Sequence, residues 1–368
     1  DVGYFSNIYG VKKKNNRIMP FRSTSEYNYN KGFATKIELK NVDVFLFSSF
    51  DKIDYNGNIL STGYHRTERE ISEKDSNSEF MAGSSIQYTN KGLNIGASFL
   101  YYTFKDSIFH QNSDYQKYYF VGKENDVLAF NASYSMKKMI FFTEMARSMN
   151  AATSYLLGLQ WDISYKTNLS LLLRNYDKRY HNIYADAVGM HNDNQNERGV
   201  YLGFSRYMNK QLSYFLGMDY YYFPFLSYRA NKSSNGEKIK LQVDYNLNNR
   251  NKINFYSTMN NHQYNDTTAN GEIKPLNNVV LQSQMRYTYS LTDELSCAFR
   301  CGYSKSFTND SKKNYGFYDY VEIIYRGKKL PIDINVRYTL FRTKDYDNRF
   351  YVYEYSLPLN YSSSLLYN

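Results

Sequence analysis

Residues 197–223, with the sequence ERGVYLGFSRYMNKQLSYFLGMDYYYF, alternate between apolar and polar positions on both sides of a short polar turn. Before the turn Val200, Leu202 and Phe204 share one parity, and after it the apolar residues again occupy every second position. Successive side chains of a β-strand point to opposite faces. The pattern therefore predicts a long β-hairpin with one apolar face and one polar face.

The same alternation recurs along the chain and predicts eight hairpins, or sixteen strands, with partial strands at both ends. The predicted strands are the two of residues 197–223 and the runs 32–39, 42–50, 79–89, 92–105, 126–136, 139–147, 155–163, 168–176, 237–247, 251–261, 278–290, 294–306, 315–326 and 330–342. Tight turns alternate with longer polar loops at 51–78, 106–125, 177–197, 224–236 and 262–277. Up-and-down antiparallel barrels of bacterial outer membranes have this arrangement, with short periplasmic turns and longer outer loops.

Strand length and the distribution of aromatic residues favour a barrel that spans a membrane. Many predicted strands run for 9 to 13 residues, whereas strands of soluble proteins average about 5 to 6 and a tilted strand needs about 9 to 11 to cross a bilayer. Apolar faces that end in Tyr or Phe suit membrane interfaces, which accounts for 42 Tyr among 368 residues. A soluble β-sandwich would need neither feature. The predicted fold is an all-β transmembrane up-and-down barrel with 16 or more strands, and about 18 or more in the full protein.

Composition and charge add little to this prediction. No apolar run approaches the roughly 18 residues of a membrane-spanning helix, and the mean hydropathy of −0.66 is polar. The densest basic run, KKKNNR at residues 12–17, is interpreted as a solvated loop. Cys297 and Cys301 would lie roughly 13 Å apart on one face of a strand, too far for a disulfide, and are interpreted as small apolar residues.

The polar face of the strands should line a lumen that is too wide for side chains to fill. It carries both charges and is biased toward basic residues. Two interpretations stay open: a solvated and cross-linked polar wall, or a wall that favours anions or a phosphate backbone in transit. The candidate lumen-facing residues are Lys36, Arg174, Asp219, Lys238, Lys240, Asp244, Arg286, Arg300, Asp333 and Arg337.

No catalytic or cofactor signature stands out, and we expect no enzyme, no cofactor and no metal. The chain lacks G-x-S-x-G, P-loop and G-x-G-x-x-G motifs. None of the histidines has metal-ligand spacing; they are His65, His110, His181, His191 and His262. HNDNQNE at 191–197 has oxygen donors at alternate positions but is interpreted as a solvated loop. A barrel hydrolase that places Ser, His and Asp on separate strands stays the third alternative.

Five stretches together resemble the β-barrel region of a Bacteroidota outer-membrane family, the helix-hairpin-helix domain-containing, competence-protein-like proteins. They are STGYHRTEREISEKD (61–75), LSLLLRNYDKRYHNIYADAVG (169–189), NERGVYLGF (196–204), YFPFLSYRANKSSNGE (222–237) and DYDNRFYVYEYSLP (345–358). In that family a signal peptide and periplasmic helix-hairpin-helix modules precede the barrel. The resemblance implies that residues 1–368 are a single barrel domain without the precursor's signal peptide, its N-terminal modules and some terminal strands.

The resemblance also implies a location in the outer membrane of a Gram-negative cell and, through the modules, DNA as a partner. Tyr64, His65 and Arg66 match a family stretch in a long loop, where they either bind a ligand or brace the loop. Our leading hypothesis is a porin-like channel or translocation pore in contact with outer-membrane lipid, with DNA uptake as its candidate role. The alternative is a scaffold or accessory subunit that assembles with other outer-membrane proteins.

Overall fold

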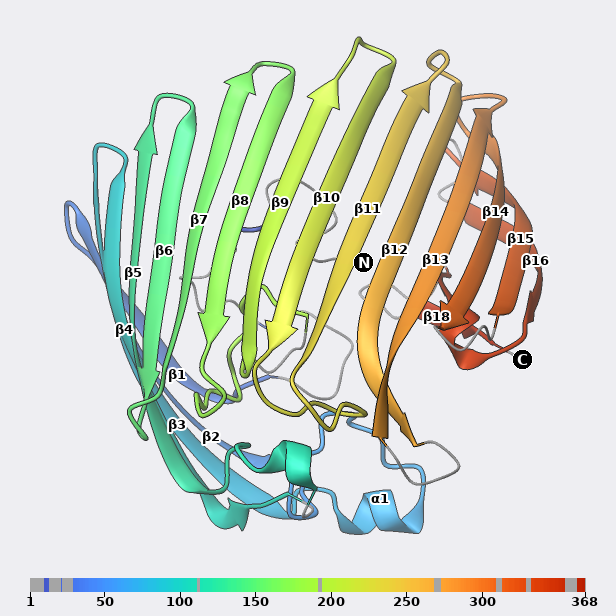
Figure 1. Cartoon of the computed structure of the whole chain (residues 1–368). Helices are drawn as coiled ribbons and strands as arrows, with labels where there is room; N and C mark the ends of the chain where they lie inside the picture. The colour runs from blue at the N-terminus through green and yellow to red at the C-terminus, as the bar shows by residue number, and fades with distance from the viewer. Residues whose placement is uncertain are drawn as a thin grey trace.

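The computed structural model describes residues 10–12, 21, 29–110, 113–190, 194–267, 273–308, 313–328, 332–354 and 363–367. Sixteen strands form one antiparallel sheet in which spatial order follows chain order (Figure 1). They are β1 (Gly32–Glu38), β2 (Val42–Ile53), β3 (Asn77–Asn90), β4 (Leu93–Ile108), β5 (Gly122–Met136), β6 (Met139–Ser148), β7 (Thr153–Ser164), β8 (Thr167–Tyr176), β9 (Glu197–Tyr207), β10 (Leu212–Phe223), β11 (Ser234–Asn246), β12 (Asn251–Thr267), β13 (Ile273–Ser290), β14 (Leu295–Thr308), β15 (Lys313–Arg326) and β16 (Asp333–Thr343). The predicted fold class and the sixteen predicted strands are confirmed.

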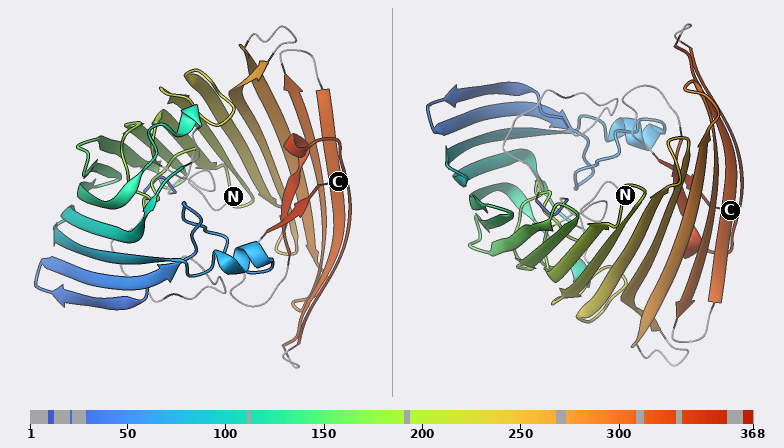
Figure 2. Two further views of the ribbon diagram at one scale, coloured as in Figure 1. Left: turned by 90° about the horizontal axis from the view of Figure 1, so that it is seen from below. Right: turned by 90° about the horizontal axis from the view of Figure 1, so that it is seen from above.

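The sheet curves into a wide arc with a clear inside and outside (Figure 2). Tight turns lie at one end of the strands, and the long loops lie at the other, with the short helix α1 (Glu68–Ser72) among them (Figure 1). In the described part of the chain the arc is not closed, since β1 pairs with β2 alone and β16 with β15 alone. Unpaired backbone groups are costly in hydrocarbon, so both edges need partners in a membrane.

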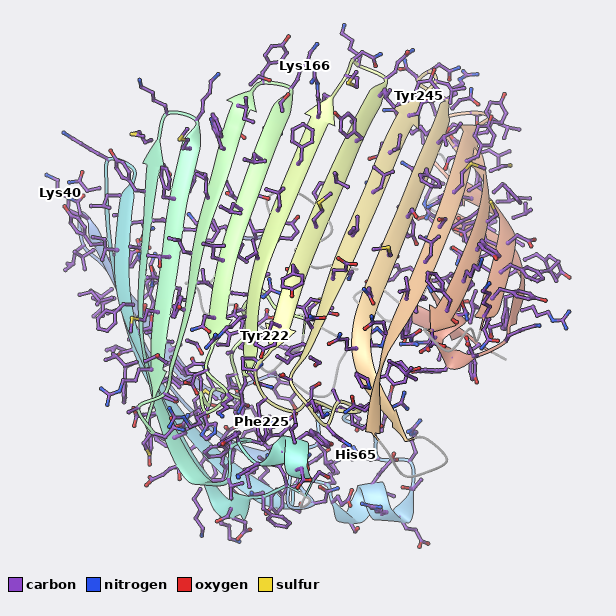
Figure 3. The ribbon with its side chains drawn as sticks, in the orientation of Figure 1. Lys40, His65, Lys166, Tyr222, Phe225 and Tyr245 are labelled. Atoms are coloured by element: carbon purple, nitrogen blue, oxygen red, sulfur yellow. The ribbon has the colours of Figure 1, made fainter. Side chains whose placement is uncertain are left out.

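The convex face is apolar and exposed. Val200 on β9 and Met218 on β10 are 45% and 41% exposed, and neighbouring strands present further large apolar side chains at every second position. Figure 3 shows Tyr245 near the tight-turn end and Tyr222 toward the long-loop end, as expected for aromatic girdles at two interfaces. An exposed apolar band of this extent belongs in contact with lipid. The sheet is therefore the wall of a transmembrane β-barrel of the bacterial outer-membrane type.

Several element boundaries differ from the prediction. The loop expected at 262–277 is shorter, because β12 runs to Thr267 and β13 begins at Ile273. Backbone pairing needs no apolar face, so a ladder can continue with polar side chains beyond the lipid. Cys297 and Cys301 are free, as expected. Of the run KKKNNR only Lys12 lies among the described residues, and residues 191–193 of HNDNQNE lie outside them.

Near its C-terminal end the chain turns inside the arc. A 3-10 helix (Tyr346–Asn348) leads into β17 (Phe350–Tyr353), which pairs with β18 (Ser363–Leu366) in a separate two-stranded sheet. Figure 2 shows this pair on the concave side of β14 to β16. The sequence pattern predicted a partial strand at this end and did not predict that it lies inside. We call residues 345–353 and 363–366 the inner hairpin.

The buried side chains lie on the concave face, where loops and the inner hairpin cover the wall. Phe350, Val352 and Leu366 of the inner hairpin pack on Tyr318 and Tyr320 of β15. Val188 of the loop between β8 and β9 packs with Leu172 and Tyr201, which are fully buried. Among the described residues no helix is long and apolar enough to cross a membrane.

Candidate functional site on the concave face

The strand register places all the predicted lumen-facing residues on the concave face. Side chains directly opposite each other in a ladder share a face. Asp219 is opposite Lys238, Arg286 is opposite Arg300, and Asp333 is opposite Arg326. Following the same pairings around the arc links these positions to Lys36, Arg174, Lys240, Asp244 and Arg337. What they bind stays a prediction, but their environments differ sharply between the two halves of the arc.

Arg174 on β8 is the centre of a buried charge cluster. Its Nε donates to Glu197 at 2.6 Å, and its Nη1 and Nη2 donate to the two carboxylate oxygens of Asp219 at 2.8 and 3.0 Å. The side chains of Arg174 and Asp219 are both 0% exposed. A planar guanidinium suits such a two-pronged pair, and carboxylates on two other strands, β9 and β10, satisfy it.

This cluster also holds the long loop between β8 and β9. The backbone N–H of Met190 donates to both carboxylate oxygens of Glu197, and the Tyr176 hydroxyl donates to the carbonyl of Val188. Gly199 lies against the guanidinium, where an added Cβ would lie 2.4 Å from Cζ of Arg174. The cation is enclosed and matched by two carboxylates, which indicates a structural brace.

Next to the brace, the first half of the arc contains a cavity of about 890 Å³. Its wall is the inner face of β2 to β8, and residues of the β8–β9 loop and residues 11–12 line its other side. Polar groups such as Gln87, Asn131 and Glu144 lie on the wall, and Tyr180 and Tyr184 lie on the loop. The cavity shows that the loop occupies part of the concave side without filling it.

A second cavity of about 740 Å³ lies in the other half of the arc. Its floor is formed by β11 to β14, and Tyr351 and Tyr353 of β17 and Ser363 of β18 border it. Three cations contribute to it, Lys240, Arg286 and Arg300, together with the ring of Tyr256. We call this the hairpin pocket.

Charge pairing in the hairpin pocket is incomplete. Glu322 accepts from Arg286 at 3.1 Å and also from Arg337, so one carboxylate serves two guanidinium groups. Asp244, the carboxylate in the lining, accepts from the amides of Asn254 and Gln242. The pocket therefore has more cations than carboxylates to match them.

The long loops form a cap at one end of the arc, with contacts between segments far apart in sequence. His181 Nε2 lies 2.9 Å from the carbonyl oxygen of Tyr118, and Asn125 donates to the carbonyl of His181. Burial lowers the pKa of His181, because desolvation disfavours the imidazolium. The ring of Tyr118 also lies edge-on to Phe225 at 4.6 Å, which ties in the loop between β10 and β11.

The predicted loop motif lies in the loop between β2 and β3. His65 Nε2 is 2.7 Å from a carboxylate oxygen of Asp54, and the Arg66 guanidinium lies 4.1 Å from the centre of the Tyr64 ring. Arg66 also donates to Glu70 of α1. These contacts stay within one loop and are those of a brace, and ligand binding by Tyr64, His65 and Arg66 stays a prediction.

Sequence reasoning missed several contributors. Glu322 lies between the outward-facing Val321 and Ile323, so alternation alone could have placed it on the polar face. Glu197 stands at the junction of a predicted loop and the predicted hairpin of residues 197–223 and was not among the lumen-facing candidates, although it opens β9 and pairs with Arg174. No alternation rule could have brought Tyr351 and Tyr353 into the pocket, because the inner hairpin lies outside the sixteen-stranded sheet.

No protein-family model matches the chain, and the comparison with curated proteins gives no match. Solved structures that resemble it include a bacterial polysaccharide outer membrane secretin, with 9% identity, a TM-score of 0.37, and coverage of 83% of this chain and 91% of that one. The outer membrane channel DcaP of Acinetobacter baumannii has 14% identity, a TM-score of 0.38, and coverage of 85% and 94%. The outer-membrane expressed OmpT of Vibrio cholerae has 10% identity, a TM-score of 0.39, and coverage of 83% and 89%.

Among the described residues no group of three or more His, Cys, Asp and Glu side chains is placed to hold a metal ion.

Proposed function

We propose that this chain forms most of an outer-membrane β-barrel that acts as a channel, in which inward-folded segments narrow the passage. The observation that carries the proposal is the contrast between the two faces of one sheet. The convex face is apolar and exposed, whereas the concave face carries charged and amide side chains around two cavities. Polar interiors of this kind conduct water and solutes in wide barrels.

DNA uptake is the finer form of this proposal. It is supported by the resemblance to helix-hairpin-helix proteins and by a concave wall on which Lys and Arg are prominent. A phosphate backbone in transit would need cations that are accessible and not saturated by carboxylates. The incomplete pairing of Arg286 and Arg300 meets that condition, whereas Arg174 does not.

The test is single-channel recording of the complete purified protein in planar bilayers, with and without short single-stranded DNA. A channel should give steady conductance, and reversal potentials in a KCl gradient should indicate a preference for anions. Voltage-dependent block by DNA would support DNA passage. Conductance that does not change when DNA is added would indicate a general diffusion channel. Absence of conductance in folded protein would overturn the channel proposal.

One observation favours a second candidate, a scaffold subunit of a larger outer-membrane assembly. The concave side is occupied by the protein's own segments, so that Leu172, Tyr201 and Tyr318 of the wall are at most 1% exposed. A scaffold needs no open passage. It should copurify in mild detergent with other outer-membrane proteins at a fixed ratio, and purification as a single species would argue against it.

A further inference from the structure

We propose that the hairpin pocket binds a small organic oxyanion, one that joins a phosphate or carboxylate group to a planar ring. This inference names a class of solute for the proposed channel. Only the role of the ligand as a solute rests on the proposed function. The binding site itself stands on three observations: a buried lysine without a close ion pair, a pair of arginines opposite each other, and an aromatic lining.

Lys240 provides the first observation. The residue is 7% exposed, and among the described residues its ammonium group has no hydrogen bond or ion pair. The ring of Tyr256 lies 5.9 Å from Nζ. Asp244, on the same face of β11, attracts the ammonium group without bonding to it, and Lys238 repels it. A buried ammonium group without a close ion pair is costly. An anion in the pocket would supply that close counterion.

The two arginines provide the second observation. Arg286 and Arg300 are direct register partners on β13 and β14, an arrangement that is unfavourable for like charges. The Nε atoms of both are buried and have no hydrogen-bond partner among the described residues. These two atoms have almost no accessible surface, so an oxyanion would accept from the exposed part of the Arg286 guanidinium and offset the repulsion between the two arginines.

The existing partners of Arg300 are neutral, which leaves its charge uncompensated. Its Nη2 donates to the Tyr256 hydroxyl at 2.6 Å and to the side-chain oxygen of Gln284 at 2.5 Å. Gln284 also accepts from the Tyr318 hydroxyl. These bonds fix the guanidinium in position while keeping its full charge, as suits a preorganised anion site.

The aromatic lining decides the rest of the ligand. Tyr351 and Tyr353 of the inner hairpin border the same cavity as Tyr256 of the wall. A volume of about 740 Å³ is far larger than inorganic phosphate requires and lies in the usual range of small-molecule sites. Tyrosine rings stack on planar groups. A ring attached to the oxyanion would therefore occupy the space between floor and hairpin.

Calorimetric titration of the folded, detergent-solubilised protein tests the inference with three probes: phenyl phosphate, inorganic phosphate and uncharged phenyl glucoside. Phenyl phosphate should bind most tightly, inorganic phosphate more weakly, and phenyl glucoside most weakly. Tyr351→Ala should weaken the binding of phenyl phosphate and leave the binding of inorganic phosphate almost unchanged. Equal binding of phenyl phosphate and phenyl glucoside would overturn the assignment of an anion site.

Variants of the cations test the floor of the pocket. Lys240→Met and Arg300→Gln should each lower the affinity for phenyl phosphate about tenfold or more, since each removes a charged hydrogen-bond donor. Arg300→Lys should recover part of the affinity, which distinguishes loss of charge from misfolding. Lys40→Met is the matched control, because Lys40 lies exposed at the tight-turn end and should not affect binding (Figure 3).

The binding site and the channel can fail separately. Conductance without phenyl phosphate binding in folded protein would overturn the hairpin pocket and leave the channel in place. Binding that Lys240→Met and Arg300→Gln weaken, in a protein without conductance, would keep the site and overturn the channel. Binding that neither variant changes would show that the anion lies elsewhere and would also overturn the hairpin pocket.

Discussion

The two halves of the concave face contain the same types of charged residue, but these residues have different roles in each half. In the first half Arg174 has two carboxylate partners and 0% exposure, and the surrounding bonds hold a loop against the wall. In the second half Lys240 and Arg300 face a cavity; Lys240 has no close ion pair among the described residues, and Arg300 donates to neutral groups. The role of a buried cation therefore depends on the carboxylates around it. A cation matched by carboxylates stabilises the fold, and a cation without them is a candidate for binding an anionic ligand.

Removing the matched cation should give the largest effect. Arg174→Met would leave Glu197 and Asp219 buried without their partner, which should reduce the free energy of unfolding by about 3–5 kcal/mol. The comparable change in the other half, Arg300→Met, should cost less, about 1.5–3 kcal/mol, since it removes charge-assisted hydrogen bonds to Tyr256 and Gln284 but leaves no buried carboxylate without its cation. Urea unfolding of the micelle-bound protein measures both. Equal losses for the two variants would break the distinction between brace and pocket.

Loosening the inner hairpin should give an intermediate effect. Asn348 is 0% exposed and bridges Ser304 and Ser306 of β14 through its side chain. Asn348→Ala should destabilise the attachment of the inner hairpin by about 1–3 kcal/mol, because it leaves buried hydroxyl groups unpaired.

Hydrogen exchange at the β17 amides should then accelerate, and channel conductance should rise as the second half of the arc opens. Asn90→Ala, at an exposed strand end near the tight turns, is the control and should change neither measurement. Unchanged exchange in the Asn348 variant would mean that apolar packing on Tyr318 and Tyr320 suffices to hold the inner hairpin.

Acidification should give the smallest effect and should act on the first half. Because burial lowers the pKa of His181, the open loop takes up a proton at a higher pH than the closed loop does. The closed loop is therefore fully stable above the ordinary histidine pKa of about 6.5, and this stability is lost as the pH falls through the lowered value.

Hydrogen exchange of the β8–β9 loop between pH 7.5 and 5.5 measures this change. His181→Gln should abolish the pH dependence, because glutamine can still donate to the Tyr118 carbonyl but does not titrate in this range. A loop that opens equally with acid in both proteins would assign the effect to another group.

The fold was largely predictable because alternation has a direct physical cause. On β9 and β10 the apolar residues Val200, Leu202 and Met218 must face lipid, which turns Asp219 inward; on β11 the same alternation turns Lys240 inward. The candidate site was predictable only as a set of residues on one face. Which of them are paired could not be read from parity, since Arg174 meets Glu197 and Asp219 from two other strands.

The sequence by itself determined a sixteen-stranded antiparallel wall with an apolar outside and a charged inside, because a strand alternates with period two and lipid tolerates no charged band. Only the tertiary structure decided that the inner hairpin turns back over β14 and β15 and that the β8–β9 loop folds onto Arg174. Those contacts join segments that are distant along the chain and follow no period. They depend on shape and on the balance of charges in space, and they separate the brace from the pocket.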